Sequence, residues 1–284
     1  MNSSILPRAD RHINAYQIRF VSEMSGHSHA LIQFTDPRPR LAVLESLAPE
    51  KLLVGGSEMN LADQLRVLVL PSNASELLDW QKRAEQWMGD TSSVKTAPPI
   101  ELRVKNGRII WKPGQAVVHA SEEDLNELLI ALADFSFYEA ELRELESQVR
   151  ADLASAPQDI RLTHAVNAAD LKLQSHINEM TSRTTLARLK FARLEPQLEN
   201  PSRLLGSAKL IASQMMERAQ ISERMEALDN QLEVLQDLYE SANDRLTEFR
   251  YFREEAALER WVICLLWLEV VLLLLELFLL QVPR

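Results

Sequence analysis

The apolar segment near the C-terminus constrains the fold of this chain most strongly. Residues 261–282 contain ten leucines and no glycine, proline, lysine or arginine, and their charged side chains are Glu269 and Glu276. A helix of this length spans about 33 Å at about 1.5 Å per residue, and the hydrocarbon core of a bilayer is about 30 Å thick. The transfer of so many leucines into hydrocarbon outweighs the cost of two acids. The segment therefore predicts a transmembrane helix over 261–282.

The residues around this segment predict its topology. Pro283 and Arg284 follow it, which indicates a single-pass, tail-anchored protein, and the lipid bilayer is the first expected partner. Arg250, Arg253 and Arg260 precede it, so the positive-inside rule places the rest of the chain on the cytoplasmic face. The predicted location is a bacterial inner membrane, or the mitochondrial inner membrane if the source is eukaryotic. The alternative is a leucine-rich oligomerisation helix in water.

Four side chains of the segment are candidates for anchoring and assembly. Trp261 and Trp267 are expected near the membrane interface. Glu269 and Glu276 are seven residues apart and share one face of a helix. Since a carboxylate that faces lipid is costly, a partner copy would shield it, and this predicts a homo-oligomer. The two acids would either line a cation path or hydrogen-bond each other in protonated form.

A heptad repeat precedes the apolar segment. Its apolar residues alternate steps of four and three over about four heptads, which is typical of a coiled-coil seam. The seam residues are Ile221, Met225, Leu228, Leu232, Leu235, Tyr239, Ala242, Leu246 and Phe249. A comparable apolar stripe runs through 121–156. The spacing leaves open whether the seam pairs within one chain or between chains.

Helical periodicity begins near Ser121, a plausible N-cap residue. It predicts one helix over 121–156 and a second over about 160–194, which stops before Pro196. A third helix is expected to start near Leu204 and to meet no proline until Pro283. Residues 120–260 are therefore predicted to form a helical coiled-coil stalk.

The first 119 residues differ from the rest in turn content and charge. They contain six of the seven glycines, and their 14 basic residues balance 12 acidic ones, whereas 120–284 contain 17 basic and 29 acidic residues. Apolar alternation and turn signals predict strands over 15–21, 30–34, 65–70 and 117–119, a helix over 76–88, and loops around 37–49. Asn106-Gly107 predicts a type I′ turn in a hairpin over 101–111. We expect a small α/β domain over 1–119.

Composition excludes several functions. The net charge of −10 argues against a nucleic-acid partner, because phosphate contacts need clustered lysine and arginine. Cys264 is the one cysteine, so no disulfide framework or cysteine-rich zinc site is possible. Since the chain also lacks catalytic motifs, we predict no catalytic residue, metal or cofactor. A hydrolase would require a cleft in 1–119 with a histidine or carboxylate of strongly shifted pKa.

The C-terminal part of the chain also carries a family pattern. It lies in Leu258-Glu259, Trp261-Val262-Ile263 and Leu268-Glu269-Val270. This stretch resembles the closing motif of the required-for-meiotic-nuclear-division (sporulation) family, in which a Leu-Glu-Trp run of aliphatics carries a second glutamate ten residues after the first. Glu259 and Glu269 keep that spacing, and Arg260 stands where the family has tryptophan. Upstream, Ile221, Arg224, Leu228, Asp229, Leu232 and Leu238 look like the family's long helix. The resemblance covers about 190–271 and implies a membrane-anchored, self-associating protein without known catalysis.

These observations predict an α+β protein with an α/β domain over 1–119, a helical stalk over 120–260 and a transmembrane anchor over 261–282. The predicted function is a non-enzymatic, oligomeric scaffold or tether that presents the α/β domain at the membrane to an unknown protein partner. The alternative is a subunit of an oligomeric cation channel or transporter, with Glu269 and Glu276 facing the pore.

Overall fold

The structure is a computed structural model that describes residues 13–23, 29–54, 63–71, 78–89, 98–105, 107–201 and 203–281. The chain divides into two compact units. Unit 1 consists of residues 1–148 and 187–230, and unit 2 consists of 149–186 and 231–284. Three long helices contribute segments to both units, so each helix is described below within the unit to which the segment belongs.

Unit 1 is built on one mixed sheet of seven strands in the order β2-β3-β1-β4-β7-β6-β5. The neighbouring strands are antiparallel except β4 and β7, which are parallel. The strands are β1 (Asn14–Val21), β2 (His29–Phe34), β3 (Arg40–Leu47), β4 (Gln64–Pro71), β5 (Ile100–Val104), β6 (Gly107–Lys112) and β7 (Gln115–Ala120).

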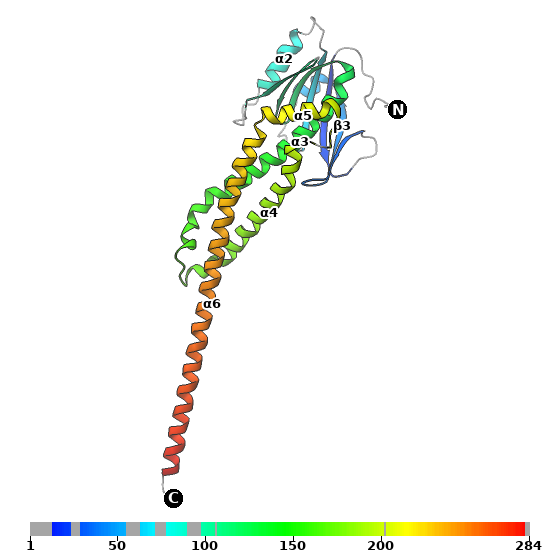
Figure 1. Cartoon of the computed structure of the whole chain (residues 1–284). Coiled ribbons are helices and arrows are strands. Elements are labelled where there is room, and N and C mark those ends of the chain that lie inside the picture. The colour runs from blue at the N-terminus through cyan, green and yellow to red at the C-terminus, as the bar shows by residue number, and fades with distance from the viewer. Residues whose placement is uncertain are drawn as a thin grey trace. The chain divides into compact units, whose positions relative to one another are not determined.

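Helices cover both faces of this sheet (Figure 1). On one face, α1 (Pro49–Val54) and α2 (Leu78–Gly89) bury Leu52 and Trp87 against apolar strand residues. On the other, α3 (Glu122–Ser155) contributes Phe135 and Phe137. The Phe137 ring stacks on that of Phe34, with 4.0 Å between centroids, and the Phe135 ring lies 4.8 Å from that of Trp111. The core therefore has two layers, one on each side of the sheet.

The helices after α3 are α4 (Gln174–Glu199), α5 (Gly206–Arg218) and α6 (Ile221–Gln281), and short 3-10 segments fill 156–173. In unit 2, side-chain contacts tie the helical segments together. Arg183 on α4 pairs with the buried Asp152 on α3 at 2.7 Å. Gln174 Nε2 on α4 donates to Asn243 Oδ1 on α6 at 2.9 Å. Beyond these contacts α6 continues alone to its C-terminal end (Figure 1).

The predicted fold class is wrong. The structure has a seven-stranded mixed sheet, and helices account for 67% of the described residues. No helix in the described part of the chain is long and apolar enough to cross a bilayer.

This finding also contradicts the predicted transmembrane anchor over 261–282. The assignment of the chain as a single-pass, tail-anchored protein depended on that span, as did its placement in a bacterial or mitochondrial inner membrane. The transmembrane, tail-anchored and inner-membrane assignments are therefore wrong. The channel alternative, which assumed the same span, is not tested by this finding and stays a prediction.

Several predicted elements are present. The strands expected over 15–21, 30–34 and 65–70 are β1, β2 and β4, and the predicted hairpin is β5–β6. The predicted loop at 37–49 is wrong, because it contains β3. In this strand Ala42, Val43 and Leu44 are all buried, so its sequence lacks the alternation of a half-buried strand. The helix predicted over 160–194 begins only at Gln174 and continues through Pro196.

The third predicted helix is divided into α5 and α6. The division lies at Ala219 and Gln220, and Gln220 has a positive φ of 53°. Only glycine and, less often, asparagine adopt this left-handed conformation readily. A glutamine at this position gives no sequence signal for the end of a helix.

Candidate assembly surface

The first part of the predicted seam belongs to unit 1 and is buried. Ile221, Met225 and Leu228 are at most 7% exposed. Beside them, Arg224 forms a two-point ion pair with Glu146 on α3, with Nε–Oε1 and Nη2–Oε2 distances of 2.7 and 2.9 Å. In unit 1 this face of α6 is therefore covered by the chain itself.

The remaining seam residues belong to unit 2. Leu232, Leu235, Tyr239, Ala242 and Leu246 are all at most 1% exposed, and Phe249 is partly exposed. The hydroxyl of Tyr239 donates to Asp159 Oδ2 at 3.4 Å, and burial raises the pKa of Tyr239 to about 12. The sequence left the seam's partner open, and in the structure the seam is buried within a single chain.

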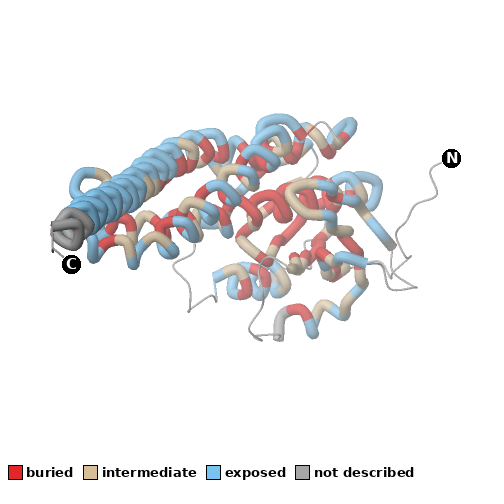
Figure 2. Tube along the Cα trace, turned by 90° about the horizontal axis from the view of Figure 1, so that it is seen from below, coloured by how far each residue is buried: buried red, intermediate tan, exposed pale blue. Residues whose placement is uncertain are grey.

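After Phe249 the environment of α6 changes abruptly. Fifteen large apolar side chains between 251 and 274 are 46–69% exposed. They are Tyr251, Phe252, Leu258, Trp261, Val262, Ile263, Leu265, Leu266, Trp267, Leu268, Val270, Val271, Leu272, Leu273 and Leu274. Figure 2 shows this part of α6 as a continuous exposed stretch. We call residues 258–274 of α6 the apolar arm.

The structure places three of the four predicted anchor residues in this arm. Trp261 and Trp267 are 69% and 67% exposed, and Glu269 is also exposed. The side chain of Glu276 lies outside the described residues. Glu269 is the one charged residue between 261 and 274, so it interrupts an otherwise apolar surface.

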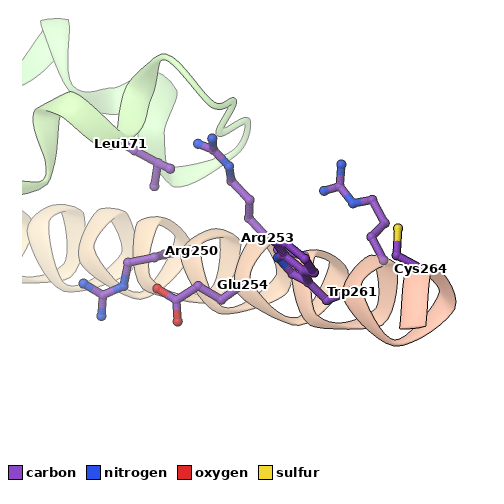
Figure 3. Close-up of a pocket in the computed structure, with 8 residues that line it drawn as sticks. Leu171, Arg250, Arg253, Glu254, Trp261 and Cys264 are labelled. Carbon is purple, nitrogen blue, oxygen red and sulfur yellow. The ribbon is translucent and has the colours of Figure 1, made fainter. Parts of the chain in front are cut away.

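A cavity of about 620 Å³ opens on α6 where the apolar arm begins. Its lining is Leu171 from the 3-10 segment Asp170–Leu173 together with Arg250, Arg253, Glu254, Ala257, Arg260, Trp261 and Cys264 from α6. In Figure 3, Arg253 extends from α6 toward the turn that carries Leu171. The Arg260 Nε donates to the carbonyl of Ala256 in its own helix at 2.9 Å. We call this hollow the arginine cavity.

A second cavity, of about 570 Å³, lies beside the sheet of unit 1. Arg108, Lys112 and His119 line it from β6 and β7, and Met88 lines it from α2. Burial lowers the pKa of His119, and the nearby charge of Arg108 lowers it further. The described lining residues include no serine, threonine or cysteine, and the other charged side chains of the cavity are Glu85 and Glu101.

Sequence reasoning missed the buried charges on α3. Glu139 and Glu141 are both 2% exposed, although glutamates are rarely buried in proteins unless they are paired. Each faces a cation in unit 1. Arg224 Nη1 lies 3.3 Å from Glu139 Oε1, and Lys190 Nζ lies 3.1 Å from Glu141 Oε2. Glu139 also pairs with Arg143 in its own helix at 2.6 Å. Periodicity cannot reveal the pairs with Arg224 and Lys190, because these partners are more than 40 residues away in sequence.

Comparisons with known proteins assign no family. No family model matches the chain, and no curated protein matches it. Among solved structures it is similar to one described as the "structure of the full-length CmaX protein", with 9% sequence identity and a TM-score of 0.34, over 98% of this chain and 88% of that one. A TM-score this low carries no argument about fold or function. The resemblance to the required-for-meiotic-nuclear-division family is untested and stays a prediction.

Proposed function

We propose that this protein is a non-enzymatic scaffold that self-associates through the apolar arm and so presents several copies of its sheet unit together. One observation carries the proposal, namely the contiguous exposure of large apolar side chains along the arm. Exposed apolar patches of this extent are rare on monomeric proteins and mark interaction sites.

The partner we propose for the arm is a second copy of this chain. Residues 261–268 are eight consecutive exposed positions, which cover more than two helical turns and therefore every side of the helix. A single groove covers only one side. The same arm on another copy offers a surface of matching length and matching chemistry, and side-by-side packing of arms leaves the flanking charges in water.

The energetics favour association through many residues. Burying one large apolar side chain contributes about 1.5–3 kcal/mol, whereas association costs roughly 4–15 kcal/mol in lost freedom of motion. Three or four buried side chains would barely offset that cost. The thirteen exposed large apolar side chains of the arm can exceed it even when each chain buries only half of them.

Sedimentation or light scattering of the full chain tests the proposal. We expect the wild type to form a multimer, and we expect the double variant Leu266→Asp/Leu273→Asp to have the mass of one chain, because two charges would be buried in the interface. Val234→Asp is the matched control, since Val234 is also exposed on α6, at 60%, but lies outside the arm. A monomeric wild type would refute the proposal.

A further inference from the structure

The arginines of α6 differ in their partners. The helix contains five, and two of them have carboxylate partners: Arg224 pairs with Glu146 at 2.7 Å, and Arg245 pairs with Glu248 at 3.2 Å. Arg250, Arg253 and Arg260 form no ion pair with any described residue, and all three line the arginine cavity. The cavity therefore gathers cations that the described part of the chain leaves without an anion.

The aromatic ring in this cavity adds a second feature. Trp261 is 69% exposed and lines the cavity with these arginines, so its ring is accessible to a bound molecule. Indole rings stack on planar groups, and guanidinium groups bind phosphate oxygens through paired hydrogen bonds. The volume of about 620 Å³ lies within the roughly 300–1,000 Å³ of typical small-molecule sites.

From these observations we infer that the arginine cavity binds a phosphorylated planar molecule of the nucleoside diphosphate or triphosphate class. Arg250 to Arg260 extends over about 15 Å of helix, which suits a chain of phosphates better than a single phosphate. Arg250, Arg253 and Arg260 would bind the phosphates, and Trp261 would stack on the base. One glutamate, Glu254, shares the lining with the three arginines, so positive charge predominates.

The arginine cavity does not require self-association of the protein. All its lining residues belong to unit 2 of one chain, so a single copy is sufficient to form it. Binding should therefore survive in the monomeric variant Leu266→Asp/Leu273→Asp, whose substitutions lie outside the lining. Failure of the scaffold proposal and failure of the ligand proposal can thus be observed independently.

Isothermal titration of the full chain with three probes tests the inference. ADP carries both ring and phosphates, pyrophosphate carries only the charges, and adenosine carries only the ring. We expect ADP to bind most tightly, and we expect added salt to weaken ADP and pyrophosphate binding, because salt screens the arginine–phosphate attraction.

Variants identify the site of binding. Arg253→Gln should weaken ADP and pyrophosphate binding at least tenfold. Trp261→Leu should weaken ADP binding severalfold and leave pyrophosphate binding unchanged. Arg245→Gln is the matched control, because Arg245 lies on the same helix outside the cavity, and it should bind ADP like the wild type. The inference is overturned if ADP does not bind to the wild type, or if Arg253→Gln binds it equally well.

Discussion

Asp134 illustrates how a single residue orders unit 1. Its side chain lies on α3 and is fully buried, and Arg203 holds it through two ion-pair contacts, of which Nη2–Oδ2 measures 2.5 Å. The Arg203 guanidinium also lies 4.0 Å from the centre of the Tyr138 ring and donates to Gln197 Oε1 at 2.5 Å. Burial raises the pKa of Asp134, and Arg203 opposes that rise. The segment before α5 is thereby fixed to α3.

Substitution of Arg203 should lower the stability of the protein. Arg203→Gln leaves the carboxyl of Asp134 buried without its cation, and we expect it to lower the free energy of unfolding by about 3–5 kcal/mol. Urea denaturation measures the difference. Arg19→Gln is the control, because Arg19 pairs with Glu45 in a pair that is 44% and 32% exposed, and such pairs contribute about 0–1 kcal/mol. Equal losses of unfolding free energy in the two variants would show that burial of Asp134 does not increase the contribution of its ion pair to stability.

At the scale of elements, the β5–β6 hairpin shows what the sequence can predict and where it fails. Asn106-Gly107 predicted the hairpin correctly, but not the position of its turn. Val104 pairs with Gly107, so Gly107 is the first residue of β6. A Cβ atom at this position would lie 1.9 Å from the carbonyl oxygen of His119 on β7. The glycine is therefore needed for close approach of two strands.

This close approach predicts a specific effect on the sheet. Gly107→Ala forces β6 and β7 apart at a backbone contact that cannot move aside, and overpacking of this kind typically costs about 1–3 kcal/mol. Thermal or urea unfolding measures the loss. Gly89→Ala at the end of α2 is the matched control, since a Cβ there meets nothing within 4 Å, and we expect almost no change. A Gly107→Ala variant as stable as Gly89→Ala would contradict the explanation.

The elements that the sequence missed share a physical cause. Local patterns predict a strand when one face is buried, and β3 lies between β1 and β2 with consecutive residues buried. The break before α6 lies at Gln220, an exposed glutamine whose positive φ no local sequence pattern predicts. The candidate surface was partly predictable, because Trp261, Trp267 and Glu269 were identified by composition. What surrounds these residues could not be predicted from the sequence, since hydrophobicity alone does not distinguish lipid from a partner protein.

At the scale of the whole molecule, the arm sets the number of copies that can associate. Two arms packed together cover one side of each helix and leave the other side in water. Because apolar residues are exposed on every side of the arm, we expect assemblies of more than two chains. The net charge of −10 per chain opposes close approach of copies, so added salt should favour the assembly.

The orientation of the chains in this assembly can be measured with the natural cysteine. In a closed ring the copies are related by one rotation axis, so the arms run parallel and the exposed Cys264 side chains lie at the same level. Mild oxidation should therefore give covalent dimers on a non-reducing gel, and no larger covalent species, because each chain has one cysteine. In an antiparallel arrangement centred on the arm, whose midpoint is Leu266, Cys264 would face Leu268 of the other copy, about one helical turn from the Cys264 of that copy.

Two variants make the result specific. Cys264→Ser should abolish the covalent dimer without changing the mass of the assembly in solution. Val234→Cys in the Cys264→Ser background moves the thiol about 45 Å along α6 and should give little crosslinking, because this position lies outside the proposed contact along the arm. If the wild type is multimeric but Cys264 gives no covalent dimer, the Cys264 side chains do not lie at the same level and the parallel ring arrangement is wrong.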